Sequence, residues 1–297
     1  MASEPLGAVG GKKVGNICPR SWYGGNAVVK GAVPQAPPTA RNAKIGDEMS
    51  FPGRNGLQAA TRTEQGPRAR NEDAVFASIF DSGDWRGLFV VADGLGGHGG
   101  GGDASKIAVQ AFEHVAERVM ASPDLFPEEV LDDALLEVNE ALRKARLGRP
   151  DRESMGTTLT ALAIHGDSAH VIHTGDSRLY RFLSTVPALL TEDHNLAFRL
   201  VKEGALAPED LATSPMRSRL YRYLGKGDSA ADMVDRQVLP LSRGDRFLLT
   251  TDGCCEGASP PIWDKTQVPA DLLNRIFDSS SESSLRDNAS AIAVAVN

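Results

Sequence analysis

Acidic residues border several short apolar runs of this chain, and this spacing is the first indication of a functional site. Some come directly after an apolar run and precede a small residue: Asp93, Asp176 and Asp252. Others come directly before an apolar run: Glu72, Asp73 and Asp287. One Asp-Gly step is a common turn signal. Several carboxylates at strand ends, however, can meet at one sheet edge, where they repel one another unless cations neutralise them. The pattern predicts a metal site.

The donor atoms indicate which metal this site would bind. All the candidate ligands are oxygen donors, and no histidine stands with a cysteine or a second histidine at zinc spacing. His170 and His173 lie three residues apart in one expected strand, so they face opposite sides. No EF-hand loop spacing is present. Hard oxygen ligands with room for water favour Mg²⁺ or Mn²⁺.

The stretch that begins at Asp93, DGLGGHGGGGDAS, consists mostly of glycine. It lacks the Gly-Lys-Ser/Thr ending of a Walker loop, and no acidic residue completes a dinucleotide fingerprint. A glycine has no side chain to keep its backbone away from a ligand. We therefore expect Gly94 to offer its carbonyl oxygen to a metal held by Asp93.

The apolar pattern predicts the elements that position these acids. Short apolar runs predict strands at residues 74–80, 87–92, 157–164, 168–174, 246–251 and 289–296. Helical spacing follows Asp103, a candidate N-cap, and again follows Pro127. Hairpin-joined strands without regular strand–helix alternation predict an α+β fold. We expect a central β-sandwich of two antiparallel sheets flanked by helices, with the metal site at one edge.

Residues 1–56 differ from the rest and predict a disordered or poorly ordered N-terminal tail before a domain at residues 57–297. The tail contains Gly, Pro and Ala without a sustained period. Between Met1 and Gly46, six basic residues stand against one acidic residue. The tail is either a docking arm for an acidic partner, a solvated extension, or the result of a start assigned upstream of Met49.

Overall composition argues against several classes of function. The net charge of −7 disfavours broad binding to nucleic acid. No apolar run is long enough to predict a membrane span, and no apolar signal core opens the chain. Three cysteines, two of them adjacent, cannot build a disulfide framework, which fits a reducing, cytoplasmic location.

Seven motifs occur in an order known from one family: RARNEDAVF, VVADGLGGHGGGGDAS, GTTLTALAI, HTGDSRLYRF, LTEDHN, GDRFLLTTDG and RDNASAIAV. Over about residues 60–296 they resemble the metal-dependent protein phosphatases of type 2C, the PPM family. Residues 191–227 resemble the flap of its bacterial branch. The resemblance implies the same β-sandwich fold. It also implies hydrolysis of phosphoserine and phosphothreonine in proteins by a hydroxide that two metal ions activate.

The resemblance further implies roles for the candidate ligands. Asp93 resembles the carboxylate that bridges two tightly bound Mg²⁺ or Mn²⁺ ions, and Gly94 the residue whose carbonyl binds one of them. Asp252 and Asp287 resemble the ligands that complete the other ion's shell. Asp176 resembles the ligand of a third, weaker metal.

Glu72 and Asp73 match residues that bind the second metal, directly or through water. Arg68 resembles the arginine that grips the substrate phosphate. Arg70 is its rival for that role, because the spacing from Gly66 is one residue short.

Two departures from the family pattern leave questions open. Leu95 stands where some members carry a histidine, so the general acid is not assigned. His98 is a candidate for either a proton donor or a structural residue beside the site. Cys254 replaces a bulky residue, and Cys254 and Cys255 are interpreted as small buried side chains, with a redox switch as the alternative.

Two other functions stay open on the sequence alone. One is a catalytically weak phosphatase-fold protein that regulates or scaffolds partners, and the other is a phosphatase of small molecules. The flap favours a phosphoprotein substrate. The expected partners are therefore that substrate and a cognate Ser/Thr kinase system, with no nucleic acid and no membrane, and we expect a monomer.

Overall fold

The computed structural model describes residues 48–97, 100–183, 186–227, 229, 231–254, 262–264, 266–279 and 285–297. All of them belong to one compact unit that spans Ala36–Asn297. The basic segment before Glu48, which the sequence assigns to a tail, lies outside the described residues.

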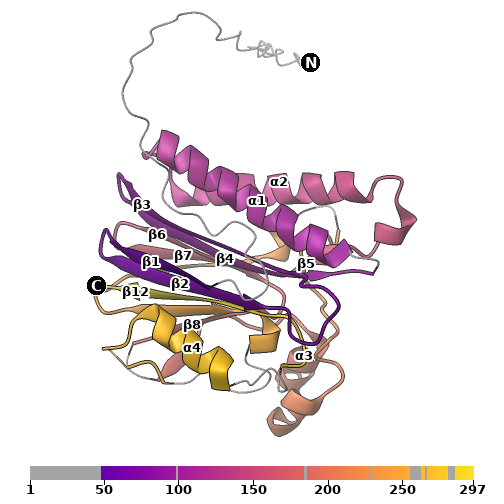
Figure 1. The fold of residues 1–297 in the computed structure, drawn as a ribbon. Helices are drawn as coiled ribbons and strands as arrows, with labels where there is room; N and C mark the ends of the chain where they lie inside the picture. Colours follow the sequence, from indigo (N-terminus) through magenta and orange to yellow (C-terminus); the bar gives the residue numbers. More distant parts are fainter. Residues whose placement is uncertain are drawn as a thin grey trace, which may run out of the picture. The chain divides into compact units, whose positions relative to one another are not determined.

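The strands form two antiparallel sheets packed face to face (Figure 1). One sheet has the order β1-β2-β12-β11-β8-β9, and the other has the order β10-β7-β6-β4-β3, with β5 paired to the end of β4. The first comprises β1 (Glu48–Arg54), β2 (Leu57–Glu64), β8 (Arg178–Phe182), β9 (Pro187–Leu189), β11 (Arg246–Thr250) and β12 (Ala289–Val296). The second comprises β3 (Asp73–Ser82), β4 (Trp85–Leu95), β5 (Gly156–Thr157), β6 (Leu159–His165), β7 (Ser168–Thr174) and β10 (Asp235–Pro240). The predicted β-sandwich is confirmed.

Helices cover the outer faces of both sheets (Figure 1). α1 (Gly100–Ala121) and α2 (Pro127–Arg146) pack on the sheet that contains β4, and α4 (Pro269–Ser279) packs on the sheet that contains β12. The connections contain α3 (Leu196–Lys202), η1 (Pro150–Arg152), η2 (Pro208–Thr213), η3 (Ala231–Met233) and η4 (Asp252–Cys254). Within the described part of the chain, no helix is long and apolar enough to cross a bilayer.

The last strand shows how the layers pack. Side chains of β12 alternate between the two faces of its sheet. Ile292, Val294 and Val296 are buried between the sheets, whereas Ala293 and Ala295 are buried under α4. The large side chains thus fill the sandwich, and the small ones let α4 lie close to its sheet.

Apolar residues at helical spacing bury α1 and α2, as the sequence predicts. Phe112, Val115 and Val119 of α1 and Leu135 and Leu142 of α2 join one buried cluster with the outer face of the β4 sheet. Burying each of these side chains stabilises the fold by roughly 1.5–3 kcal/mol relative to exposure.

Two boundaries differ from the sequence prediction. Residues 48–54, assigned to the tail, form β1, which pairs with β2. β1 is an edge strand of its sheet. The folded domain therefore begins before residue 57.

The helix expected after Asp103 begins earlier, at Gly100. Asp103 lies in its first turn, where the Asp103 carboxylate pairs with Arg152 at 2.7 Å.

Candidate metal centre

The predicted acidic ligands share one end of the sandwich because antiparallel strands begin and end there in turn. Asp73, at the start of β3, stands directly opposite Asp93, near the end of β4. Asp252 follows β11, and Asp287 precedes β12, the strand paired with β11. Asp176 lies in the turn between β7 and β8. The fold thus gathers these acids at one edge, and metal binding by them stays a prediction.

Asp93 lies in an environment that disfavours a free carboxylate. Burial is the largest cause that raises the pKa of Asp93 well above its usual value. The charges of the other aspartates add to the shift: Asp73, Asp252, Asp176 and Asp287. Asp93 is therefore the acid on which the charges of all the others act.

Asp73 and Asp176 show the same effect. Burial, helped by the charges of Asp252 and Asp287, raises the pKa of Asp73 to about 7. Burial, helped by the charges of Asp252 and Asp193, raises the pKa of Asp176 to about 8. A cation bound among these acids would favour their charged forms and relieve the repulsion.

The donor atoms fit a hard divalent cation. Among the described side chains, Asp73 Oδ1 is a buried oxygen without a hydrogen-bond partner, whereas its Oδ2 accepts the Thr251 hydroxyl at 2.8 Å. No three acidic, histidine or cysteine side chains of the described residues form a closed chelating cluster. Glu72, Asp93 and Asp287 instead line an open pocket, which suits Mg²⁺ or Mn²⁺ because these ions keep water ligands.

Glycines let the acid-bearing segments approach one another closely. A Cβ on Gly94 would lie 2.0 Å from the carbonyl oxygen of Gly101, in the first turn of α1. A Cβ on Gly253, next to Asp252, would lie 2.1 Å from the carbonyl oxygen of Asn288. Both distances are far below van der Waals contact. The glycines of the two Asp-Gly steps therefore allow backbone segments to touch, and the glycine-rich start of α1 packs against β4.

Gly94→Ala is expected to push α1 away from β4 and to weaken Mn²⁺ binding. Overpacking of this kind costs about 1–3 kcal/mol, which lowers the melting temperature of a domain of this size by roughly 3–10 °C. Thermal unfolding and Mn²⁺ calorimetry measure the two effects. Gly102→Ala is the matched control, because its Cβ would meet its nearest neighbour, Asn71 O, at an ordinary 3.6 Å. Equal melting temperatures for the two variants would contradict the contact argument.

Asn288 is a site residue that the sequence analysis quotes within a motif but does not assign. Its Oδ1 accepts the backbone N–H of Glu72 at 2.8 Å. Its Nδ2 donates to the carbonyl oxygens of Gln65 at 2.8 Å and Arg70 at 2.9 Å. Asn288 therefore fixes the loop before β3 relative to Asp287. The only sequence signal is an asparagine between an acid and a strand start.

An open pocket of about 290 Å³ lies over this edge of the sandwich. Its walls are formed by Arg68, Ala69, Arg70, Glu72, Asp93, Gly94, Asp287 and Asn288. The guanidinium of Arg68 forms an ion pair with Asp287, and the Arg68 side chain is 57% exposed. Both candidate arginines thus border the pocket, and the ion pair places the Arg68 guanidinium beside a predicted metal ligand.

The remaining predicted residues divide into two groups. His98 and Cys255 lie outside the described residues. Cys254 is buried, and its Sγ lies 3.0 Å from the carbonyl oxygen of Ser290, which fits a small buried side chain.

Comparison with known sequences agrees with this geometry. Residues 64–290 match the family model of protein phosphatase 2C. The serine/threonine protein phosphatase PstP of Mycobacterium tuberculosis is 33% identical over 225 residues, which cover 75% of this chain and 40% of PstP. The serine/threonine phosphatase Stp of Listeria innocua is 32% identical over 200 residues, which cover 66% of this chain and 77% of Stp. The chain thus spans about two fifths of the length of PstP.

Solved structures show the same fold. The crystal structure of Mycobacterium tuberculosis PstP has a TM-score of 0.68 at 29% identity and covers 81% of this chain and 99% of that one. The PstP catalytic domain in complex with two manganese ions has a TM-score of 0.66 at 28% identity and covers 80% of this chain and 97% of that one. The family model and these structures confirm the predicted resemblance. The chain belongs to the protein phosphatase 2C family of serine/threonine phosphatases.

Proposed function

We propose that this chain hydrolyses phosphoserine and phosphothreonine in proteins, with two Mg²⁺ or Mn²⁺ ions bound at the acidic edge of the sandwich. The observation that carries the proposal is the group of four aspartates whose charges act on Asp93, beside an open pocket that Arg68 and Arg70 help to line. The manganese complex of the PstP catalytic domain supports it. The open pocket suits a phosphorylated side chain of a protein.

The acids would divide among the metal sites as the family resemblance implies. Asp93 would ligate both ions, and the other ligands would be Gly94 through its carbonyl, Asp252, Asp287, and Glu72 and Asp73 directly or through water. Asp176 would hold a third ion more weakly. The bound ions supply the positive charge that makes water available as hydroxide near neutral pH and that polarises the phosphoryl group.

Arg68 would bind the phosphoryl oxygens of the substrate. Its side chain is largely exposed and lines the pocket. The planar fork of N–H donors matches two phosphoryl oxygens at once. The backbone behind it is held because Gln65 Nε2 donates to the Arg68 carbonyl at 2.6 Å.

Arg68→Ala is expected to raise KM for a phosphothreonine peptide by about tenfold to a hundredfold, the range for one or two charge-assisted hydrogen bonds. Mn²⁺ affinity should stay near that of the wild type. Steady-state kinetics and calorimetry give the two values. Arg70→Ala is the matched control, because it removes the same charge from the same pocket. A larger rise in KM for Arg70→Ala would assign the phosphate contact to Arg70 instead.

The proposed function itself is tested by phosphate release from a phosphothreonine peptide. The full chain should release phosphate with Mn²⁺ and none with excess EDTA. A small phosphoester serves as a second substrate and separates protein phosphatase activity from activity on small molecules. Mn²⁺ binding without turnover of either substrate would exclude the proposed activity and favour a regulatory or scaffold role.

A further inference from the structure

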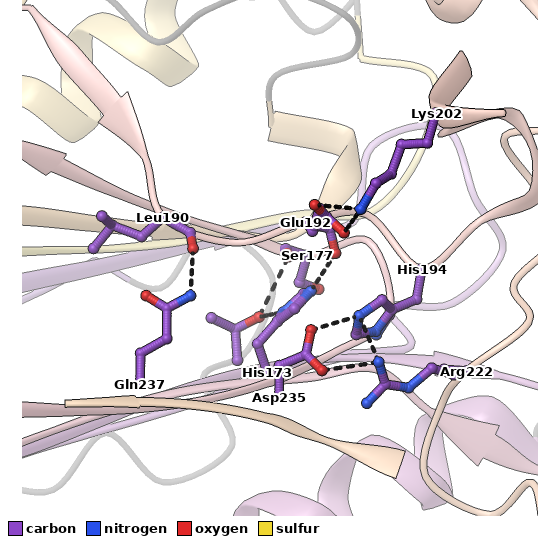
Figure 2. A network of polar contacts seen from close by, with 11 residues as sticks. His173, Ser177, Leu190, Glu192, His194, Lys202, Arg222, Asp235 and Gln237 are labelled. Carbon is purple, nitrogen blue, oxygen red and sulfur yellow. Dashed lines mark hydrogen bonds and ion pairs between the residues drawn. The ribbon is translucent and has the colours of Figure 1, made fainter. Parts of the chain in front are cut away.

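The start of the flap, with Glu192 and His194, lies beside the segment from His173 to Ser177 (Figure 2). Asp176 belongs to this segment, which forms the turn between β7 and β8. Four consecutive flap residues each face a partner in or beside that turn, in the pairs Glu192–His173, Asp193–Arg178, His194–Gly175 and Asn195–Asp176. Residues of the motif LTEDHN therefore contact residues of the motif HTGDSR in successive pairs.

His194 holds both backbone groups of Gly175, the residue before Asp176. The Gly175 N–H donates to His194 Nδ1 at 3.2 Å, and the His194 N–H donates to the Gly175 carbonyl at 2.7 Å. Gly175 has φ +103°, and a Cβ there would lie 2.5 Å from Thr158. The turn thus has a conformation that only glycine adopts easily, and His194 clamps it from the flap side.

These contacts fix which nitrogen of His194 carries the proton. Nδ1 accepts a hydrogen bond from Gly175, so the proton of the neutral ring is on Nε2. Nε2 faces Asp235 Oδ2 at 3.0 Å, and Arg222 Nη1 donates to Asp235 Oδ1 at 2.8 Å (Figure 2). Arg222 Nη1 also lies 3.2 Å from His194 Nε2, so the N–H groups of these two nitrogens lie close together. The Asp235 carboxylate accepts a hydrogen bond from each of them, which stabilises the two donors side by side.

We propose that Asp235 is a positioning residue for Asp176 and acts through His194. Its carboxylate keeps His194 in the tautomer that accepts the Gly175 N–H, and this contact holds the Gly175–Asp176 turn. The inference rests on the proposed function, in which Asp176 holds the weaker metal. Asp235 lies on β10, an edge strand of mostly exposed residues, and belongs to none of the family motifs.

Asp235→Asn tests this role because it keeps the shape of the side chain and replaces one acceptor oxygen with an N–H₂ donor. The amide oxygen would pair with the charged Arg222, which turns the amide N–H₂ toward His194 Nε2. Nε2 would then have to accept, and the proton would move to Nδ1, where it faces the Gly175 N–H. Asp132→Asn is the matched control. It breaks an exposed ion pair to the same strand, between Asp132 Oδ1 and Arg236 Nη2 at 2.7 Å, and touches neither His194 nor Gly175.

The first measurement uses the full chain without added metal. Proton–nitrogen correlation spectra of the His194 ring should show the proton on Nε2 in the wild type and in Asp132→Asn, and on Nδ1 in Asp235→Asn. Hydrogen exchange of the Gly175 amide should become about fivefold faster in Asp235→Asn alone, as expected for one lost hydrogen bond. An unchanged tautomer and unchanged exchange in Asp235→Asn would overturn the proposal.

The second measurement is Mn²⁺ calorimetry on the wild type, Asp235→Asn and Asp176→Asn. The weakest Mn²⁺-binding step should disappear in Asp176→Asn. In Asp235→Asn its affinity should fall about fivefold, with the affinities of the tighter steps unchanged. A weak step that Asp176→Asn removes but Asp235→Asn leaves intact would refute the positioning role alone. A wild type without any step that depends on Asp176 would instead refute the assignment of the third metal. In Asp235→Glu, which restores the acceptor, the weak step should partly return.

Discussion

Asp93→Asn is expected to lower kcat at saturating Mn²⁺ by about a hundredfold or more, while the protein stays folded. The charges of Asp73, Asp252, Asp176 and Asp287 all act on the Asp93 carboxylate, so a cation is favoured there. On the proposed assignment, the substitution removes a negative charge from two metal sites at once. With one cation fewer, the site would supply less of the positive charge that makes water available as hydroxide near neutral pH.

Asp252→Asn is the informative comparison for this prediction. Asp252 follows β11 at the same edge and on the proposed assignment ligates a single ion. Its loss should weaken one site, and raising Mn²⁺ should restore a large part of the activity. The same titration should restore little in Asp93→Asn.

The measurement is phosphate release against Mn²⁺ concentration, with stoichiometry by calorimetry and folding by circular dichroism. Both variants should melt at or above the temperature of the wild type without metal, because each relieves repulsion between neighbouring carboxylates. Full activity of Asp93→Asn, or equal rescue of both variants by Mn²⁺, would exclude the bridging role.

The sequence predicts the strands and the long helices because their apolar patterns match local periods. β12, for example, has the bounds expected from its sequence, since each of its residues is buried on one face or the other. The acids were found for a related reason. A carboxylate next to a strand stands at a sheet edge, and antiparallel pairing places Asp73 directly opposite Asp93.

The errors arise where a distant contact outweighs a local preference. Glycine disfavours helix, so the sequence places the start of α1 after the glycine run. In the structure, Gly101 is already helical because its missing side chain lets α1 touch Gly94. The sequence pattern does not predict β1, because Pro and Gly interrupt it. The register of β1 also shifts between Phe51 and Arg54.

Residues that support the site from a distance could not be predicted from one sequence. Asn288 contacts three backbone groups of the segment 65–72, which lies 216 to 223 positions away in the chain, and nothing in its own neighbourhood indicates this. The contact of His194 with Asp235 joins residues 41 positions apart. Local pattern gives the elements and the acids, whereas these polar contacts exist only once the sheets are packed.

Removal of metal should make the stability of the protein strongly dependent on pH. The pKa values of Asp73 and Asp176 are raised from 3.8 to about 7 and about 8 in the folded chain. In the unfolded chain, both carboxyls lose their protons near pH 4. Between about pH 4 and pH 8 the folded state therefore binds more protons, and its stability falls as the pH rises. Above about pH 8 this dependence ends.

The expected result is a melting temperature of the EDTA-treated protein that drops by roughly 5–10 °C between pH 5 and pH 8, as a loss of a few kcal/mol implies for a domain of this size. With saturating Mn²⁺ the drop should largely disappear, because bound cations hold these carboxylates charged at every pH in that range. Asp176→Asn should reduce the drop in EDTA, since an amide does not titrate. Other groups of the chain titrate equally in both conditions, so the difference between the Mn²⁺ and EDTA curves isolates the acidic edge. Parallel curves with and without Mn²⁺ would mean that these aspartates do not bind the metal.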